Sequence, residues 1–362
     1  MTPTSEAVAT SGPRPHVPAP TPRGPASRAL LGLLVVEDRD TARSLTDAFA
    51  RATDLALSET RDVLTDEDLQ LTLFLLYLLH YGPGEYVRGD WEWDPQLLAI
   101  RATIEEAVES ALRGRVPMPE NLPKDGVGTS ALLFEMTAGA AHPTLAKWLS
   151  RNAEPSLLQE FLIHRSIYTL READPHSWAI PRLRGRAKAA LVEIQSDEYG
   201  GGRPDLVHAE IFAGTMRAMG LDERPEAYLD RVPATTLLPV NVMSLFGLHR
   251  RLRGAIVGHL AAFEMTSSIP NRHYSQAFAR AGHGSDVTWY FDEHVEADAV
   301  HEQIAGRDLA GSLVESDPAL LGDVIFGAAA CLFLDDLAGE HMLAAWQDGR
   351  SSLRTPTDST GR

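Results

Sequence analysis

From about residue 140 to residue 347, long amphipathic stretches alternate with short breaks at Gly, Pro and Asn. Apolar residues recur at the spacing of an α-helix, and no run of alternating β-branched residues indicates a strand. Such helices bury their apolar faces by packing side by side, so an all-α helical bundle is predicted. Helices are expected at 142–150, 154–171, 182–199, 204–219, 223–230, 236–266, 271–282, 286–307 and 317–347.

Composition divides the chain into four parts. Residues 1–27 are rich in Pro, Ser, Thr and Ala, and residues 348–362 have a similar polar composition. Both ends are predicted to be disordered because they offer too little apolar surface to order themselves. Residues 28–140 are predicted to form an additional N-terminal helical region, and residues 141–347 the bundle.

Two features of the N-terminal region stand out. An apolar helix is predicted at 69–81, after the acidic capping segment at 65–68. An ordinary core helix is the preferred interpretation, and an interface in a homodimer or a cap over the bundle is the alternative. Residues 116–128, rich in Pro, Gly and Asn, are the best linker candidate in the chain.

The charge and the single cysteine exclude several classes of protein. The formal net charge of −17 argues against a nucleic-acid partner, because phosphates require a basic surface. Cys331 lies in an apolar stretch and is interpreted as a buried side chain, so no disulfide framework or thiolate zinc site is expected. No apolar run is long enough to span a bilayer, and the short run at 29–36 is a poor signal peptide. A cytoplasmic protein without membrane association is therefore expected.

The segment WYFDEHVEADAVHEQ carries the sharpest chemical pattern. His294, Asp298 and His301 fall at i, i+4 and i+7, which is one face of a helix. Two imidazoles and one carboxylate form a ligand mixture that suits non-haem iron. Taken alone, this helix is equally well explained as a charged surface face with incidental histidines.

Two further segments supply matching side chains. Glu198 ends one predicted helix and His208 begins the next, and the glycines at 200–202 between them permit a tight reversal. Glu264 lies among Ala, Phe and Met near the end of an apolar helix, where a carboxylate is costly unless it is paired, protonated or metal-bound. An acid that reaches solvent at the helix end is the alternative for Glu264.

Together these positions supply three carboxylates and three imidazoles, the material from which helical bundles build two-metal sites. Two divalent cations carry four positive charges, so a fourth acid or an oxygen-derived ligand would complete the balance. The predicted ligands are Glu198, His208, Glu264, His294, Asp298 and His301.

The order and spacing of these residues resemble those of the haem-oxygenase-like dimetal oxidases and oxygenases. The block EFLIHRSIYTLREADPHSWAIPRLRGRAKAALVEIQSDEYGGGRPDLVHAEIF resembles more closely the iron-containing redox enzymes of that group, and the resemblance covers about residues 150–347. It implies a haem-oxygenase-like bundle and the six ligands named above. Some members that oxidise nitrogen carry one additional early Glu.

Three acids are candidates for that additional ligand. They are Glu160, Glu172 and Glu193, of which Glu160 and Glu172 are favoured without a choice between them. His164 lies four residues after Glu160, a spacing that suits joint metal binding, although a supporting or structural role is preferred for this pair. Asp174, His176 and Trp178 are expected either to shape the mouth of the site or to serve folding.

The resemblance implies an enzyme that holds two Fe(II) ions, or a mixed manganese–iron pair, and takes O2 as co-substrate. N-oxygenation of a small amine or amino-acid-like substrate in a natural-product pathway is the favoured reaction, with an external electron donor as an optional partner. Oxidative C–C cleavage or decarboxylation of an amino or fatty acid is the alternative. A non-catalytic helical metal-binding protein is the competing hypothesis, because a fold does not decide a reaction.

Overall fold

The computed structural model describes residues 17–82, 84, 86–140 and 144–355, except the side chains of 39, 40, 139, 140, 144 and 296–299. This part of the chain is all-α, as predicted, and its only β-type pairing is an isolated bridge between Tyr199 and Val207. The α-helices are α1 (Pro25–Leu34), α2 (Arg39–Glu59), α3 (Glu67–Leu78), α4 (Pro95–Arg115), α5 (Gly126–Ala140), α6 (Thr144–Asn152), α7 (Pro155–Thr169), α8 (Asp174–Ser177), α9 (Gly185–Glu198), α10 (His208–Ala218), α11 (Ala234–Leu248), α12 (Arg253–Arg280), α13 (Ser285–Gln303), α14 (Ser312–Ser316) and α15 (Leu321–Gln347).

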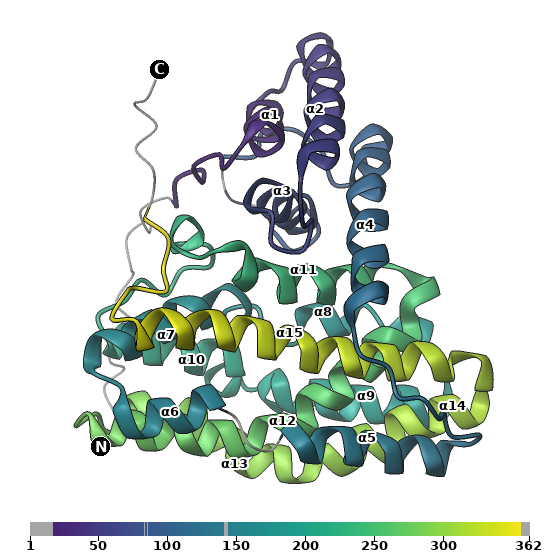
Figure 1. Cartoon of the computed structure of the whole chain (residues 1–362), viewed down its shortest axis with the longest axis vertical. Coiled ribbons are helices and arrows are strands. Elements are labelled where there is room, and N and C mark those ends of the chain that lie inside the picture. Colours follow the sequence, from purple (N-terminus) through teal and green to yellow (C-terminus); the bar gives the residue numbers. More distant parts are fainter. Residues whose placement is uncertain (1–16, 83, 85, 141–143, 356–362) are drawn as a thin grey trace, which may run out of the picture.

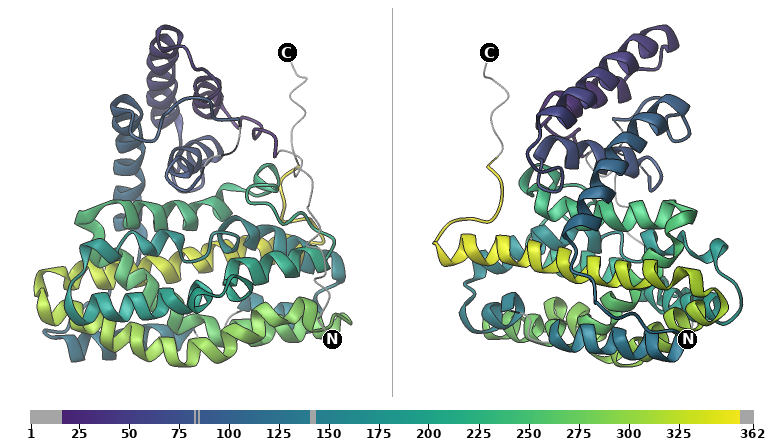
Figure 2. Two further views of the ribbon diagram at one scale, coloured as in Figure 1. Left: turned by 180° about the vertical axis from the view of Figure 1, so that it is seen from behind. Right: turned by 45° about the vertical axis from the view of Figure 1, so that its right-hand side comes forward.

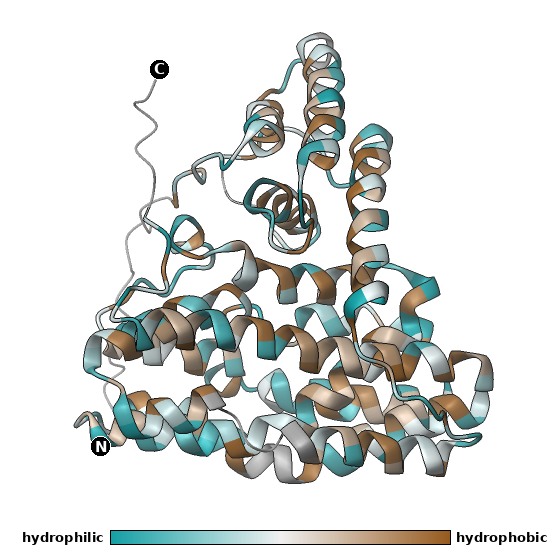
Figure 3. Ribbon diagram, viewed as in Figure 1, coloured by the Kyte–Doolittle hydropathy of each residue, from teal (hydrophilic) through white to brown (hydrophobic). Residues whose placement is uncertain are grey.

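The helices form two layers of unequal size (Figure 1). Helices α1 to α4 stand on one side of a larger bundle in which α12, α13 and α15 are the longest members, and α11 lies where the two parts meet. The same arrangement is visible from behind and from the side (Figure 2). Hydrophobic residues recur along α11 and α15 in Figure 3, consistent with their central positions. Within the described residues, no helix is long and apolar enough to cross a membrane.

The apolar helix expected at 69–81 is α3, and residues 68–78 are all buried. Its N-cap, Asp66, accepts hydrogen bonds from the backbone amides of Asp68 and Leu69, as the acidic capping segment predicts. The apolar surface of α3 is therefore taken up by contacts within the chain.

Helix α5 packs with the bundle, although it lies in the predicted N-terminal region. It contacts α12, α14 and α15, and Figure 1 shows it at the α14 end of the bundle. At Gly126 a Cβ atom would overlap the backbone of Gly311, so this contact between α5 and the bundle requires glycine. The linker candidate at 116–125 therefore connects α4 to a helix that packs with the bundle.

The expected helix at 236–266 is interrupted, and its successor is longer than predicted. A short 3₁₀ turn at Arg250–Leu252 separates α11 from α12, and α12 then continues through Pro270 to Arg280. A proline inside a helix costs about 3 kcal/mol, which the packing of α12 against α13 and α15 can offset. In place of the expected helix at 223–230 the structure has turns and the short 3₁₀ turn Leu229–Arg231.

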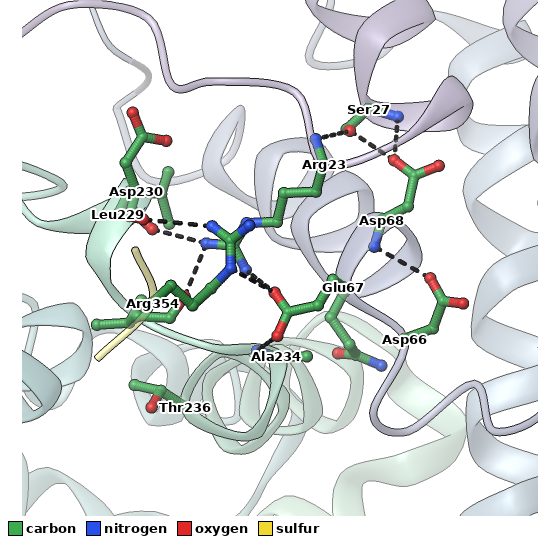
Figure 4. Close-up of polar contacts among 12 residues, drawn as sticks. Arg23, Ser27, Asp66, Glu67, Asp68, Leu229, Asp230, Ala234, Thr236 and Arg354 are labelled. Atoms are coloured by element: carbon green, nitrogen blue, oxygen red, sulfur yellow. Dashed lines mark hydrogen bonds and ion pairs between the residues drawn. The ribbon is translucent and has the colours of Figure 1, made fainter. Parts of the chain in front are cut away.

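Parts of both chain ends that were predicted to lie outside the fold are held by specific contacts (Figure 4). Arg23 pairs with Glu67 at 2.7 Å and donates to the carbonyl oxygens of Leu229 and Val232 at 2.7 and 2.9 Å. Arg354, from the other end of the chain, approaches the same Glu67 carboxylate at 3.2 Å. Burial lowers the pKa of Arg23 to about 10, with Glu67 opposing the shift. Residues 17–27 and 348–355 therefore join the N-terminal helices to the start of α11.

Replacing Glu67 with alanine should destabilise the chain, because the buried Arg23 guanidinium would lose its main counter-charge. The side chain of Arg23 is 1% exposed. We expect the free energy of unfolding to fall by about 2–4 kcal/mol in a urea titration. Asp47→Ala, an exposed acid on α2, should change it by less than about 0.5 kcal/mol. Equal effects of the two substitutions would show that the network does not anchor the N-terminal helices.

Candidate metal centre

Six acidic and histidine side chains converge in the interior of the bundle. Their ligand atoms form two groups in which all atoms lie within 4.8 Å of one another, and Glu198 belongs to both groups. All six residues are buried. The first group is Glu172, Glu198, His208 and His294, and the second is Glu198, Glu264 and His301.

The turn between α9 and α10 brings Glu198 and His208 together. Gly200, Gly201 and Gly202 have φ values of 68°, 59° and 84°, which glycine adopts without strain. The bridge between Tyr199 and Val207 closes the loop. As a result His208 Nδ1 lies 3.0 Å from Glu198 Oε2, as the spacing and the glycines predicted.

On α13, His294 and His301 are two turns apart and both face the interior. His294 Nδ1 donates to the carbonyl oxygen of Tyr290 at 2.7 Å, which leaves Nε2 aimed into the cluster. His301 Nδ1 lies 3.2 Å from Glu264 Oε2, and its Nε2 lies 3.0 Å from Asp197 Oδ2. Asp298 belongs to the same helix, but its side chain lies outside the described residues.

Of the additional candidates, Glu172 alone joins the cluster. Its two carboxylate oxygens lie 2.9 and 2.8 Å from Tyr290 Oη, which donates to them, and Glu172 Oε2 is 3.7 Å from His294 Nε2. Glu172 follows the end of α7, just before Ala173, which has a φ of 71°. The structure therefore places Glu172 in the cluster, whereas the sequence favoured Glu160 and Glu172 equally as the additional ligand.

The other three candidates lie elsewhere. Glu160 Oε2 accepts from Trp346 Nε1 at 2.8 Å and from the backbone N and Oγ of Ser352 at 2.9 and 2.8 Å. His164 lies between the hydroxyl groups of Thr236 and Ser352, at 2.7 and 2.9 Å. The preferred structural role of Glu160 and His164 agrees with these contacts. Glu193 is exposed on α9 and does not approach the cluster.

The ionisation of the cluster shows how strongly its charges interact. Burial and the neighbouring Glu198 raise the pKa of Glu172 to about 8, and burial also raises the pKa of Glu264. Burial opposes the charged forms of His208 and His301, but the nearby carboxylates raise the pKa of each to about 9. Protons thus supply the positive charge that these acids need, and a metal ion would compete with them.

Unsatisfied atoms within the cluster fit a cation. Glu198 Oε2, His208 Nδ1 and His294 Nε2 are buried and make no hydrogen bond. Although the first two atoms are 3.0 Å apart, they do not align as donor and acceptor. Lone pairs that converge in this way are what a metal ion requires, and a mixture of imidazole and carboxylate suits iron. The buried cluster therefore fits a metal site.

A small pocket adjoins the cluster and is lined by Tyr168, His176, Phe263, Ser267 and neighbouring residues. His176, which the sequence placed near the mouth of the site, pairs with His259, its Nε2 lying 3.2 Å from His259 Nδ1. Burial lowers the pKa of His259 to about 4 and also lowers that of His176, so this pair is uncharged at neutral pH.

Sequence reasoning missed two residues that orient the cluster. Asp197, which directly precedes Glu198, lies with its Oδ2 atom 3.0 Å from His301 Nε2. Tyr290 donates a hydrogen bond to Glu172 through its hydroxyl group and accepts one from His294 through its backbone carbonyl oxygen. The spacing could have indicated Tyr290, because it lies four residues before His294 on the same helical face.

The buried His164 should make folding sensitive to acid. Burial lowers its pKa from 6.5 to about 3, so the folded protein keeps it neutral while the unfolded chain protonates it. Its contribution to stability is full above about pH 6.5 and is lost as the pH falls toward 3. In urea unfolding of metal-free protein, His164→Gln should flatten the fall in stability by up to about 1.4 kcal/mol per pH unit between pH 6 and 4. Parallel pH profiles of the variant and the parent chain would contradict this.

Comparison with known proteins identifies the class. Residues 159–336 match the family model described as iron-containing redox enzyme, with the haem-oxygenase-like fold. Through this domain the chain belongs to the iron-containing redox enzymes, so the predicted family is confirmed. The matched segment contains every residue of both ligand groups.

The chain is also similar to a nitrosourea synthase of Streptomyces achromogenes subsp. streptozoticus. The two are 26% identical over 190 residues, which cover 51% of this chain and 40% of the relative. The aligned region thus spans less than half of the relative's length. The family supports an oxidoreductase activity for this chain.

Proposed function

We propose that this protein is a non-haem di-iron oxygenase that uses O2 to oxidise a small organic substrate. The observation that carries the proposal is the presence of two buried ligand groups that share Glu198. A shared carboxylate is the usual means by which a helical bundle holds two metal ions close together. Two Fe(II) ions are the metals proposed here, and a mixed manganese–iron pair is the alternative.

Charge balance favours two divalent ions over one. The described cluster contains the carboxylates of Glu172, Glu198 and Glu264, and Asp298 is proposed as a fourth acid on the same face of α13. Four carboxylates would offset the four positive charges of two Fe(II) ions. A single divalent ion would offset only two of these negative charges, and protons would have to neutralise the other two.

The protein's own groups fix the ligands and limit access. Tyr290 holds Glu172 and His294, and Asp197 accepts from His301 Nε2, so each of these side chains has a fixed orientation. Phe263 and Tyr168 line the adjoining pocket and restrict the entry of bulk water. Bound iron would supply the electrons that reduce O2, and an external donor would restore them.

N-oxygenation of an amine is the proposed reaction. The name of the similar nitrosourea synthase refers to a product with oxidised nitrogen, which supports this choice over carbon–carbon cleavage. Oxidative C–C cleavage or decarboxylation at the same site is the second candidate. The identity of the site residues alone does not discriminate between these reactions.

Iron loading and oxygen uptake test the proposal directly. Purified metal-free protein is titrated with Fe(II) under anaerobic conditions, and bound iron is counted after desalting. We expect two irons per chain, followed by consumption of O2 on mixing with air-saturated buffer and an amine panel. Binding of one ion or none, or two bound irons that never consume O2, would contradict the proposal. Two bound irons that never consume O2 would favour a non-catalytic metal-binding protein.

A further inference from the structure

A second cavity lies where the N-terminal helices meet the bundle. It is lined by residues of α3, α7, α8 and α11 and has a volume of about 20 Å³. Phe74, Leu78, Ile167 and Pro175 contribute apolar surface to its wall. Roughly 10–15 Å³ is enough for one water molecule, so this second cavity has room for a molecule of two or three atoms. It is too small for an organic amine.

The polar groups around the second cavity are already satisfied. Tyr77 Oη donates to Glu105 Oε1 at 2.9 Å, and Tyr81 Oη donates to Ser244 Oγ at 3.2 Å. Among the described residues that line the second cavity, no buried side-chain nitrogen or oxygen lacks a hydrogen-bond partner. A buried water molecule makes about three hydrogen bonds to otherwise unsatisfied groups. The second cavity therefore favours an apolar occupant over water.

The pocket beside the metal centre has the opposite character. His176 Nδ1, Gln195 Oε1 and Glu198 Oε2 belong to residues that line it, and all three atoms are buried without a hydrogen-bond partner. His294 Nε2 is a fourth such atom. This pocket therefore suits polar ligands, whereas the second cavity suits a small apolar molecule.

The side chain of Tyr168 separates the two cavities. Of the described residues, Tyr168 alone lines both. Its ring packs against Phe263 in the pocket beside the metal centre, with ring centroids 5.5 Å apart. The neighbouring residues Pro175 and His176 are divided between the two walls, since Pro175 lines the second cavity and His176 lines the other pocket. The two spaces are therefore one side chain apart.

The second cavity also approaches the molecular surface. Tyr81, Arg171 and Val240 line it and are partly exposed. The Arg171 guanidinium bonds Glu226 Oε1 at 2.8 and 2.6 Å and the carbonyl oxygen of Tyr81 at 2.8 Å. These bonds tie the segment after α3 to the bundle. A small molecule can therefore reach the second cavity along the boundary between the N-terminal helices and the bundle.

We propose that the second cavity holds dioxygen and delivers it to the metal centre past the ring of Tyr168. O2 is diatomic and apolar, so its transfer from water into a dry cavity of this size is favourable. Helix α3 thereby contributes to the reaction, because Phe74, Tyr77 and Leu78 form one wall of the route. This inference rests on the proposed function and deepens it by assigning the path of the co-substrate.

Methyl relaxation in metal-free protein detects O2 in the second cavity without relying on catalysis. O2 is paramagnetic, so it accelerates the nuclear relaxation of methyl groups that it contacts. Ile167 lines the second cavity, whereas Ile104 on α4 is equally shielded from solvent and lines neither cavity. Under O2 pressure, we expect the relaxation rate of the Ile167 δ1 methyl group to rise several-fold more than that of Ile104. Equal increases for the two methyl groups would overturn the proposal.

A substitution that fills the second cavity tests delivery to the metals. Val240→Phe places a phenyl ring in the cavity, so it should abolish the excess relaxation of Ile167 and slow the reaction of iron-loaded protein with O2 several-fold. Val192→Phe is the control, because Val192 is 44% exposed on α9 and lines neither cavity. An unchanged rate constant for O2 in Val240→Phe would overturn the route.

Xenon tests the same route in the unmodified chain. Xenon is apolar and inert, and apolar cavities in proteins take it up. Crystals held under xenon should show a xenon peak between Ile167 and Val240, and xenon pressure should slow O2 uptake by the iron-loaded protein several-fold. A xenon peak at this position without any effect on O2 uptake would overturn delivery through the second cavity.

Iron content separates this inference from the proposed function. Val240→Phe should retain two irons per chain, because Val240 belongs to neither ligand group. Two bound irons and normal oxygen uptake without excess relaxation at Ile167 would overturn the role of the second cavity alone. Failure of the unmodified chain to bind iron would overturn the proposed function, although the excess relaxation at Ile167 would still be expected.

Discussion

Replacing Glu198 with alanine is expected to remove both metal ions at once. Glu198 is the one described residue that belongs to both ligand groups, so its loss leaves each group short of a carboxylate. We expect the affinity for Fe(II) to fall by roughly 100-fold or more at both positions, and oxygen uptake to be lost. Bound iron per chain, measured after anaerobic loading and desalting, checks this prediction.

Two further variants serve as comparisons for Glu198→Ala. Glu264→Ala should affect the second ligand group only and leave about one iron per chain, because Glu264 is absent from the first group. Glu193→Ala, an exposed acid on the same helix as Glu198, should leave iron content unchanged. If Glu198→Ala and Glu264→Ala each removed the same single ion, Glu198 would not be shared between two sites.

Replacing Gly258 with alanine is expected to disrupt the packing of α12 against α15. A Cβ atom at Gly258 would overlap the carbonyl oxygen of Val324, and one at Gly327 would overlap that of Ala255. Both obstacles are backbone atoms, so the helices would have to move apart along their contact. We expect Gly258→Ala to lower the free energy of unfolding by about 3 kcal/mol, at the upper end for overpacked cores.

Gly322 provides the control for this prediction. It lies in the first turn of α15, and a Cβ atom there would meet nothing within 4 Å. Because alanine favours helix, Gly322→Ala should be neutral or raise stability by up to about 1 kcal/mol. Urea unfolding of the two variants compares them directly. A Gly258→Ala variant as stable as Gly322→Ala would show that the close approach of α12 and α15 is not required.

The helical periodicity predicted the fold class and the faces of the helices, and the residues between 198 and 208 predicted a local turn. These features could be predicted because they depend on neighbours in the sequence. The choice between Glu160 and Glu172 could not be made in this way. Glu160 accepts hydrogen bonds from Trp346 on α15 and from Ser352, and Ser352 lies in a tail that composition alone placed outside the fold.

The ordered parts of the two chain ends could not be predicted either, because they also depend on contacts between distant residues. Composition correctly describes a segment with little apolar surface. It cannot show that one side chain in such a segment will find buried partners elsewhere in the fold. Arg23 and Ser352 are held by particular partners on distant helices, and those partners become neighbours only when the bundle forms. The packing of α5 against the bundle depends on a distant contact in the same way, because Gly126 and Gly311 lie far apart in the sequence.

We propose that two metal ions lie on either side of Glu198. Crystals of the protein loaded anaerobically with Fe(II), measured at wavelengths on both sides of the iron absorption edge, locate the metals independently of activity. We expect two iron peaks, one among Glu172, His208 and His294 and the other between Glu264 and His301, with Glu198 contacting both. A single iron peak, or iron bound away from Glu198, would contradict it.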